Sequence, residues 1–172
     1  VRGNGAILVN HEGKRFYNEL ETRDNVSAAI LKQTDKNAFL FFDSDMQKSL
    51  KATNNYIKQS YTVTGNSLDE IAAKMKVPAA ALQQTMTEYA AAVAAKNDKQ
   101  FGRADLPRPL NKAPFYAIIV TPAVHHCMGG IKIDTKTQVY GQNGQIIPGL
   151  FAAGEVTGGV HGGNRLGGNA QA

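Results

Sequence analysis

Gly149-Leu-Phe-Ala-Ala-Gly-Glu155 and the stretch Gly158–Asn169, which begins three residues later, decide how this chain is interpreted. The first segment is typical of a turn and a short buried strand that ends in a carboxylate, which suits hydrogen bonding to ribose or ribityl hydroxyls. The second contains six glycines. So much glycine raises the entropy lost on folding, and this indicates a backbone that contacts a ligand. Arg165, the only charged residue in that stretch, can grip a carboxylate with two hydrogen bonds. A flexible loop is the alternative for each segment taken alone.

The composition changes along the chain, because 12 of the 17 glycines follow residue 128. The 172 residues are 42% hydrophobic, which argues against disorder. No apolar run approaches the roughly 20 residues that span a bilayer, and the single cysteine excludes an internal disulfide framework. The chain begins at Val1 and stops inside the glycine-rich segment, so we expect it to be a piece of a longer protein.

The net charge of +5 raises the possibility of nucleic-acid binding. The 19 basic residues are spread along the chain, however, with no cluster of five or more. A solvated basic surface is the simpler explanation. A basic balance also suits a small anionic substrate that is steered towards a cleft, and we favour this over nucleic acid.

The hydrophobic pattern predicts an α+β fold for residues 1–110, with a small mixed sheet, and a segment of a different, α/β domain over 111–172. Expected strands cover residues 5–10, 15–19, 38–42, 61–64 and 115–120. Expected helices cover 25–33 (capped by Asp24), 44–52, the segment through Met75 that follows the capping box Ser67–Glu70, and 79–96.

His125-His-Cys-Met-Gly-Gly130 is the remaining candidate for chemistry. Adjacent histidines on a strand point to opposite sides, so at most one faces a given site. The paired glycines let another group approach the backbone closely. Four histidines and one cysteine give no recognised zinc spacing, and we expect no metal site.

The chain resembles the flavoprotein fumarate reductase and succinate dehydrogenase family, close to its soluble flavocytochrome c type. The matching strings are Arg2–Asn10, Gly13–Phe16, Thr22–Asp24, His125–Gly130, Ile133–Thr135 and the glycine-rich stretch through Asn169. The resemblance implies that 1–110 is a clamp (capping) domain, with 1–10 leading in from an FAD-binding domain, and that 111–172 is the incomplete return segment of that FAD domain. It also implies an FAD-dependent reductase that moves a hydride from flavin N5 to the C=C bond of a small unsaturated carboxylate, fumarate first.

The resemblance assigns residue roles. Arg23 matches the proton donor and Arg2 a proton-relay arginine, while His125 and Arg165 match residues that hold a substrate carboxylate. The matches to flavin contacts are His126, Met128, Gly130, Gly154, Glu155, Asn164, Gly167, Gly168 and Asn169. Hydride addition builds carbanion character, which a carboxylate gripped by Arg and His delocalises. An arginine is a reasonable acid only if its proton loss is concerted with relay from a neighbour such as Arg2.

Two departures leave alternatives open. Cys127 stands where fumarate-reducing members usually carry Thr, so urocanate or a methacrylate-type enoate is the alternative substrate. The dinucleotide-binding G-x-G-x-x-G turn is absent from these 172 residues, so an isolated, non-catalytic clamp module is a second alternative. The resemblance further implies a cytochrome or flavin electron-donor domain or subunit, with haem or FMN on other domains, and a periplasmic or else cytoplasmic location. The dispersed basic residues and the lack of a long apolar run lead us to expect no nucleic-acid partner and no membrane span in this segment.

Overall fold

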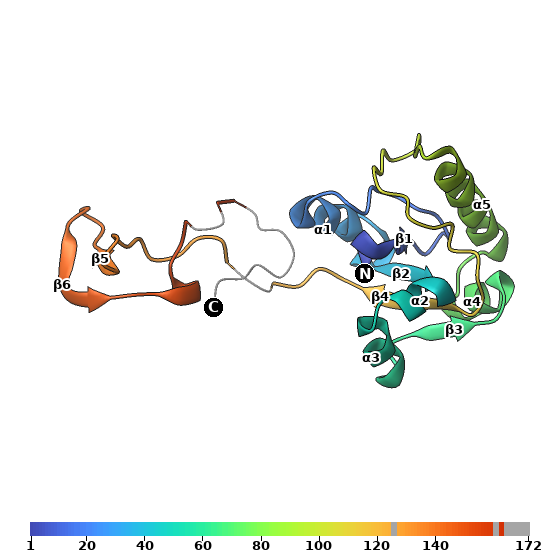
Figure 1. The fold of residues 1–172 in the computed structure, drawn as a ribbon, viewed down its shortest axis with the longest axis horizontal. Coiled ribbons are helices and arrows are strands. Elements are labelled where there is room, and N and C mark those ends of the chain that lie inside the picture. The colour runs from blue at the N-terminus through green and yellow to red at the C-terminus, as the bar shows by residue number, and fades with distance from the viewer. Residues whose placement is uncertain (125–126, 160–161, 164–172) are drawn as a thin grey trace. The chain divides into compact units, whose positions relative to one another are not determined.

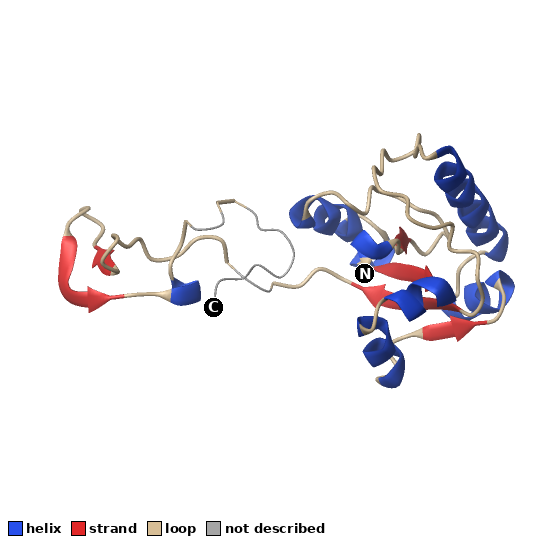
Figure 2. Ribbon diagram, viewed as in Figure 1, coloured by secondary structure: helices blue, strands red, loops and turns tan. Residues whose placement is uncertain are grey.

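The computed structural model describes residues 1–124, 127–159 and 162–163 (Figures 1 and 2). The chain divides into two compact units, Val1–Pro122 and Ala123–Ala172. The boundary expected after residue 110 differs from this division. The strand over 115–120 belongs to the sheet of the first unit, because it pairs there with strands on both sides.

The first unit is built on a four-stranded sheet in the order β1-β2-β4-β3. Its strands are β1 (Ile7–Val9), β2 (Ala38–Asp43), β3 (Val63–Gly65) and β4 (Phe115–Val120). All three pairings are antiparallel, so the prediction of a mixed sheet was wrong. Val9 at the end of β1 pairs with Phe39 near the start of β2. The connection between the two strands therefore brings the chain back beside the end of β1. Strand β2 then runs in the opposite direction, which makes the pair antiparallel.

Strand β2 forms the centre of the core. All six of its residues are buried, as a continuous apolar run predicts for a strand covered on both faces. Phe41 stacks on Phe115 with ring centroids 5.8 Å apart, and Phe42 stacks on Tyr116 at 5.2 Å. These cross-strand aromatic pairs fix the register between β2 and β4.

The first unit has five α-helices, and the sequence accounts for several of their ends. Figure 2 shows helices lying around the sheet. They are α1 (Arg23–Leu31), α2 (Ser44–Ser49), α3 (Ala52–Lys58), α4 (Leu68–Met75) and α5 (Ala79–Ala95). The predicted cap of α4 is confirmed, because Ser67 Oγ accepts a hydrogen bond from Glu70 N at 3.1 Å. Leu82, Met86 and Tyr89 of α5 are buried, as their spacing predicts.

Three local predictions need correction. Residues 15–19 form no strand beyond one isolated bridge between Val9 and Arg15, because the ends of this segment are held in buried ion pairs instead. Helix α1 begins at Arg23 with Thr22 as its N-cap residue, so Asp24 lies in the first turn rather than at the cap. The helix expected over 44–52 is two helices, separated where Leu50 adopts an extended backbone.

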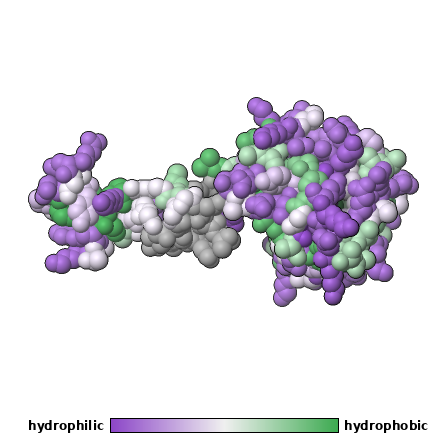
Figure 3. Space-filling view, turned by 90° about the horizontal axis from the view of Figure 1, so that it is seen from above, coloured by the Kyte–Doolittle hydropathy of each residue, from purple (hydrophilic) through white to green (hydrophobic). Residues whose placement is uncertain are grey.

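The second unit contains a two-stranded antiparallel sheet of β5 (Gln138–Tyr140) and β6 (Ile146–Phe151), followed by the 3₁₀ turn η3 (Gly154–Val156). The short strand expected after Gly149 is present, but it starts earlier and is not buried. Leu150 is 46% exposed and Phe151 59% exposed, because within the described residues only β5 pairs with β6. Figure 3 shows hydrophobic atoms on the surface of this unit.

No helix within the described residues has the length and apolar character needed to cross a membrane.

Candidate active site

The two arginines predicted to be catalytic lie near each other in the first unit. Arg2 opens the 3₁₀ turn η1 (Arg2–Asn4) and is half-buried, whereas Arg23 is the first residue of α1 and is exposed. Burial lowers the pKa of the Arg2 guanidinium, and the positive charge of Arg23 lowers it further. Both effects ease the loss of a proton from Arg2, which is the property that a relay arginine requires.

Arg2 is held at both its backbone and its side chain. Its Nη1 donates a hydrogen bond to the backbone oxygen of Glu19 at 3.0 Å. Its own carbonyl accepts a hydrogen bond from Nη2 of Arg103, also at 3.0 Å. The position of Arg2 is therefore set by two residues from distant parts of the sequence.

Those two residues belong to a buried ion network made of Arg15, Glu19, Asp98 and Arg103. None of the four is more than 6% exposed. Glu19 Oε1 accepts from Arg15 Nε at 2.9 Å and from Leu8 N at 3.2 Å. Its Oε2 accepts from Arg15 Nη2 at 2.9 Å and from Arg103 Nη1 at 3.1 Å. Asp98 Oδ2 completes the network by accepting from Arg15 Nη2 at 2.9 Å.

The charges in this network stabilise one another. Although burial raises the pKa of the Asp98 carboxyl, the hydrogen bond from Arg15 and those from the backbone N–H groups of Phe101 and Arg103 lower it below its ordinary value. Burial lowers the pKa of Arg15, but its bonds to Glu19 and Asp98 raise it overall. The bonds between Arg15 and Asp98 therefore favour the charged form of both side chains although they are buried.

Aromatic rings cover the two arginines of the network. The Arg15 guanidinium lies 5.0 Å from the ring centroid of Tyr89 and 4.9 Å from that of Phe101. The Arg103 guanidinium lies 5.8 Å from the Tyr89 ring. Burial raises the pKa of the Tyr89 hydroxyl, which donates to the backbone oxygen of Gly5 at 3.4 Å. These contacts exclude water from charges that would otherwise be solvated.

Sequence reasoning missed this network. Arg15 and Glu19 were assigned to a strand, and Asp98 and Arg103 follow α5 in a segment without any recognised motif. The sequence offers no signal that would have paired Glu19 with Arg103, because 84 residues separate them.

In the second unit, Gly130 and Gly158 lie where two segments of backbone come together. Ile131 N donates to Val156 O at 2.9 Å, and Gly158 N donates to Ile131 O at 3.2 Å. A Cβ atom on Gly130 would lie 2.5 Å from Val156 O and 2.6 Å from Gly158 N. The close approach predicted at the paired glycines is therefore present, and the group that approaches Gly130 is the protein's own backbone.

Two other cofactor residues predicted in this unit, Gly154 and Glu155, lie together in one turn. Gly154 has a positive φ of 78° and opens the turn η3, which carries the exposed Glu155. A Cβ on Gly159, which follows this turn in the glycine-rich stretch, would meet no atom within 4 Å. An exposed carboxylate in a glycine-rich turn fits the hydroxyl groups of FAD. Met128, also predicted to contact the flavin, is half-buried.

Seven predicted residues lie outside the described part of the chain. They are the substrate-binding candidates His125 and Arg165 and the cofactor candidates His126, Asn164, Gly167, Gly168 and Asn169.

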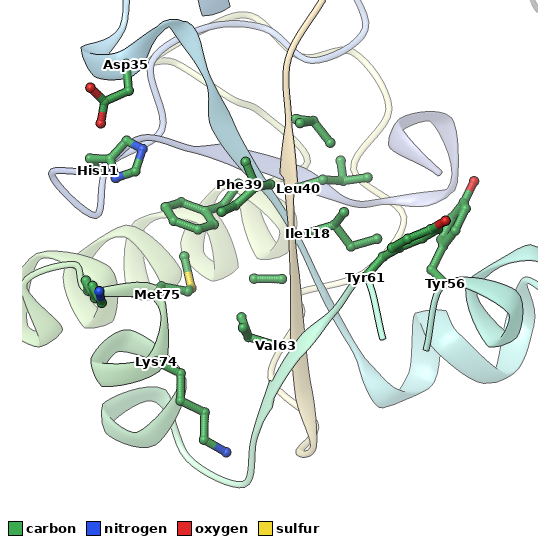
Figure 4. A pocket seen from close by; sticks show the side chains of 14 residues that line it. His11, Asp35, Phe39, Leu40, Tyr56, Tyr61, Val63, Lys74, Met75 and Ile118 are labelled. Carbon is green, nitrogen blue, oxygen red and sulfur yellow. The ribbon is translucent and has the colours of Figure 1, made fainter. Parts of the chain in front are cut away.

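A pocket of about 780 Å³ lies against the sheet of the first unit (Figure 4). No predicted site residue lines it, and two of its polar side chains, His11 and Lys74, have partners within the protein. His11 Nε2 lies 2.7 Å from Asn37 Oδ1. Lys74 Nζ donates to Thr64 O at 2.6 Å and to Glu70 at 2.7 Å. This pocket is therefore separate from the Arg2 and Arg23 site.

Comparison with known proteins shows the family. Residues 1–170 match the family model described as "FAD binding domain". The chain is 54% identical over 170 residues to a fumarate reductase (cytochrome) of Shewanella frigidimarina. This match covers 99% of this chain and 30% of the relative. The chain is 35% identical to a urocanate reductase of Eggerthella lenta, covering 95% of this chain and 28% of the relative.

A solved structure is similar over nearly the whole chain. It is the open conformation of a flavocytochrome c3 fumarate reductase, with a TM-score of 0.80 and 45% sequence identity. The match covers 98% of this chain and 30% of that one. The chain thus spans about a third or less of the length of these relatives.

Proposed function

The chain belongs to the FAD binding domain family, and from that premise we propose that it is part of an FAD-dependent reductase of small unsaturated carboxylates, with fumarate as the first candidate. The observation that carries this proposal is the pair Arg2 and Arg23, which lie near enough for their charges to interact. The family resemblance matches them to the relay and the proton donor of such a reaction. The names of the relatives, which include fumarate and urocanate reductases, agree with the substrate class.

In the proposed reaction, His125 and Arg165 hold a carboxylate of the substrate. Bound FAD would supply the hydride from its N5 atom to one alkene carbon. The gripped carboxylate then delocalises the negative charge that develops on the neighbouring carbon. Met128, Gly130, Gly154 and Glu155 would hold the cofactor, together with the candidates that lie outside the described residues.

Arg23 delivers the proton to the second alkene carbon. Arg23 is the first residue of α1, so the partial positive charge at the helix N-terminus adds to the repulsion from Arg2. Arg2 replaces the proton that Arg23 gives up, and this concerted relay makes a guanidinium usable as an acid.

The test is Arg23→Gln in the full-length enzyme. Turnover should fall about 10³-fold with FAD still bound, since positioned acids contribute factors of this order. The matched control is Lys32→Gln, which removes an exposed positive charge just after the C-terminal end of the same helix and should leave turnover unchanged. Near-normal turnover of Arg23→Gln would remove Arg23 from the mechanism.

Cys127 favours a second candidate substrate, urocanate or a methacrylate-type enoate, because fumarate-reducing members usually carry Thr at this position. The Cys127 thiol is exposed. Turnover with fumarate, urocanate and methacrylate, measured in the native enzyme and in Cys127→Thr, separates these substrates. We further propose that residues 1–110 act as the clamp and that a cytochrome or flavin domain or subunit supplies electrons.

A further inference from the structure

Arg103 makes more contacts around the relay arginine than its place in a connecting segment would require. Its guanidinium donates to Arg2 O at 3.0 Å, Ala6 O at 2.9 Å, Glu19 Oε2 at 3.1 Å and Asp105 O at 2.8 Å. The residue is only 2% exposed. One side chain thus joins the turn that carries Arg2, the approach to β1 and the carboxylate of Glu19.

Glu19 completes the arrangement from the other side. Its backbone oxygen accepts the hydrogen bond from Arg2 Nη1 at 3.0 Å, while its carboxylate binds Arg15 and Arg103. Arg2 is therefore fixed at its carbonyl by Arg103 and at its guanidinium by Glu19, and these two residues are bonded to each other. A movement of either one moves the guanidinium of Arg2.

We propose that Glu19 and Arg103 are positioning residues for proton delivery: they hold Arg2 at the distance from Arg23 at which a proton can pass between the two guanidiniums. This inference rests on the proposed function, because it assumes that Arg2 is the relay.

A purely structural role would not explain why the network is ionic. Replacing a buried ion network with packed hydrophobic side chains often leaves a protein equally stable or more stable. The network holds Glu19 and Arg103, whose backbone oxygen and guanidinium bind Arg2, and so fixes its geometry. Catalytic geometry is sensitive on this scale. A displacement of about 1 Å can lower a rate by about 10²-fold.

The experiment uses the full-length, FAD-loaded enzyme with Arg103→Lys and Glu19→Gln. Lysine keeps the charge but cannot reach four acceptors, whereas glutamine keeps the shape and backbone oxygen of Glu19 but lacks its charge. Each variant should lower kcat by about 10- to 100-fold, with KM within about threefold because no substrate contact is lost. The control is Thr85→Val, which removes the buried bond from Thr85 Oγ1 to Gly13 O and should lower Tm without changing kcat.

A double-mutant cycle with Arg2→Lys tests whether Arg103 acts through Arg2. Adding Arg103→Lys to Arg2→Lys should change kcat by less than about twofold, since a residue that acts through another has nothing left to position. If the kcat losses of Arg2→Lys and Arg103→Lys multiply in the double variant, this inference is overturned and the proposed function is not. Full turnover of Arg2→Lys would overturn both the inference and the relay in the proposed function. Loss of bound FAD in both network variants, with Thr85→Val intact, would assign the network a structural role and also overturn the inference.

Discussion

Gly130→Ala should weaken FAD binding in the full-length enzyme, whereas Gly129→Ala should not. A Cβ on Gly130 would lie 2.5 Å from Val156 O, 2.6 Å from Gly158 N and 2.7 Å from Thr157 C. Ordinary contacts start at 3.4 Å, so the two segments would have to separate by roughly 0.7–0.9 Å. The obstacles are backbone atoms, which cannot rotate away as a side chain can.

The expected loss follows from two contributions. Overpacking of this kind costs about 1–3 kcal/mol. The bonds Ile131 N to Val156 O and Gly158 N to Ile131 O would also weaken, at about 1 kcal/mol each if lost. A net 2–4 kcal/mol is expected, which corresponds to a Kd for FAD that rises roughly 30- to 1,000-fold if FAD needs the native path of these segments.

The assay is flavin titration of the deflavinated full-length protein, followed by fluorescence. Gly129→Ala is the matched control, because its Cβ would meet nothing within 4 Å in this chain and its backbone φ is not positive. Its Kd should stay within about threefold of the native value. Equal Kd values for the two variants would refute the reasoning that this backbone approach supports the cofactor site.

Two further predictions concern acid stability and substrate binding. The pKa of Asp98 is lowered in the folded protein, so the unfolded chain binds more protons at low pH. The contribution of Asp98 to the free energy of unfolding is fully present above its pKa in the unfolded chain, about 3.9. It is lost as pH falls through its lower pKa in the folded protein. We therefore expect the urea midpoint of unfolding to fall more steeply with decreasing pH, below about pH 4, in the native protein than in Asp98→Asn. Equal pH dependence of the two midpoints would contradict this. Arg165→Met should raise KM and lower kcat, because its grip on the carboxylate should tighten as negative charge develops. Steady-state kinetics test this. A change in KM alone would mean that Arg165 binds the substrate and the transition state equally well.

Local chemistry made parts of the fold predictable. The apolar run 38–42 predicted the central strand β2, because a strand covered on both faces needs apolar residues throughout. The capping box Ser67–Glu70 predicted the start of α4, since its hydrogen bonds span only three residues. The roles of Arg2 and Arg23 came from the family resemblance, and no local pattern marks either residue.

Features set by contacts between distant residues could not be predicted. The strand over 115–120 was recognised, but its pairing with β2 and β3 was not, because these partners lie far away in sequence. Residues 15–19 were predicted to form a strand, yet Arg15 and Glu19 are buried with charges contributed by Asp98 and Arg103. Pairings of this kind depend on tertiary structure, which can override local propensity.

The 172-residue chain by itself should fold over its first unit but should not bind FAD tightly. The first unit has its own core around β2, and this core is closed by α4 and α5. The second unit leaves apolar side chains exposed, with Val124 at 94%, Phe151 at 59% and Val156 at 52%. No G-x-G-x-x-G turn occurs in the sequence to hold the pyrophosphate at a helix N-terminus.

Titration of the purified chain with FAD tests this, with the deflavinated full-length enzyme as the positive control. Flavin fluorescence should change little with the chain and show saturable binding with the control. The two outcomes show which residues FAD needs. A well-folded chain that does not bind FAD means that the cofactor needs residues beyond these 172. Stoichiometric, submicromolar binding would show instead that the cofactor residues within these 172, Gly154 and Glu155 among them, are sufficient. The missing nucleotide turn would then not matter for affinity.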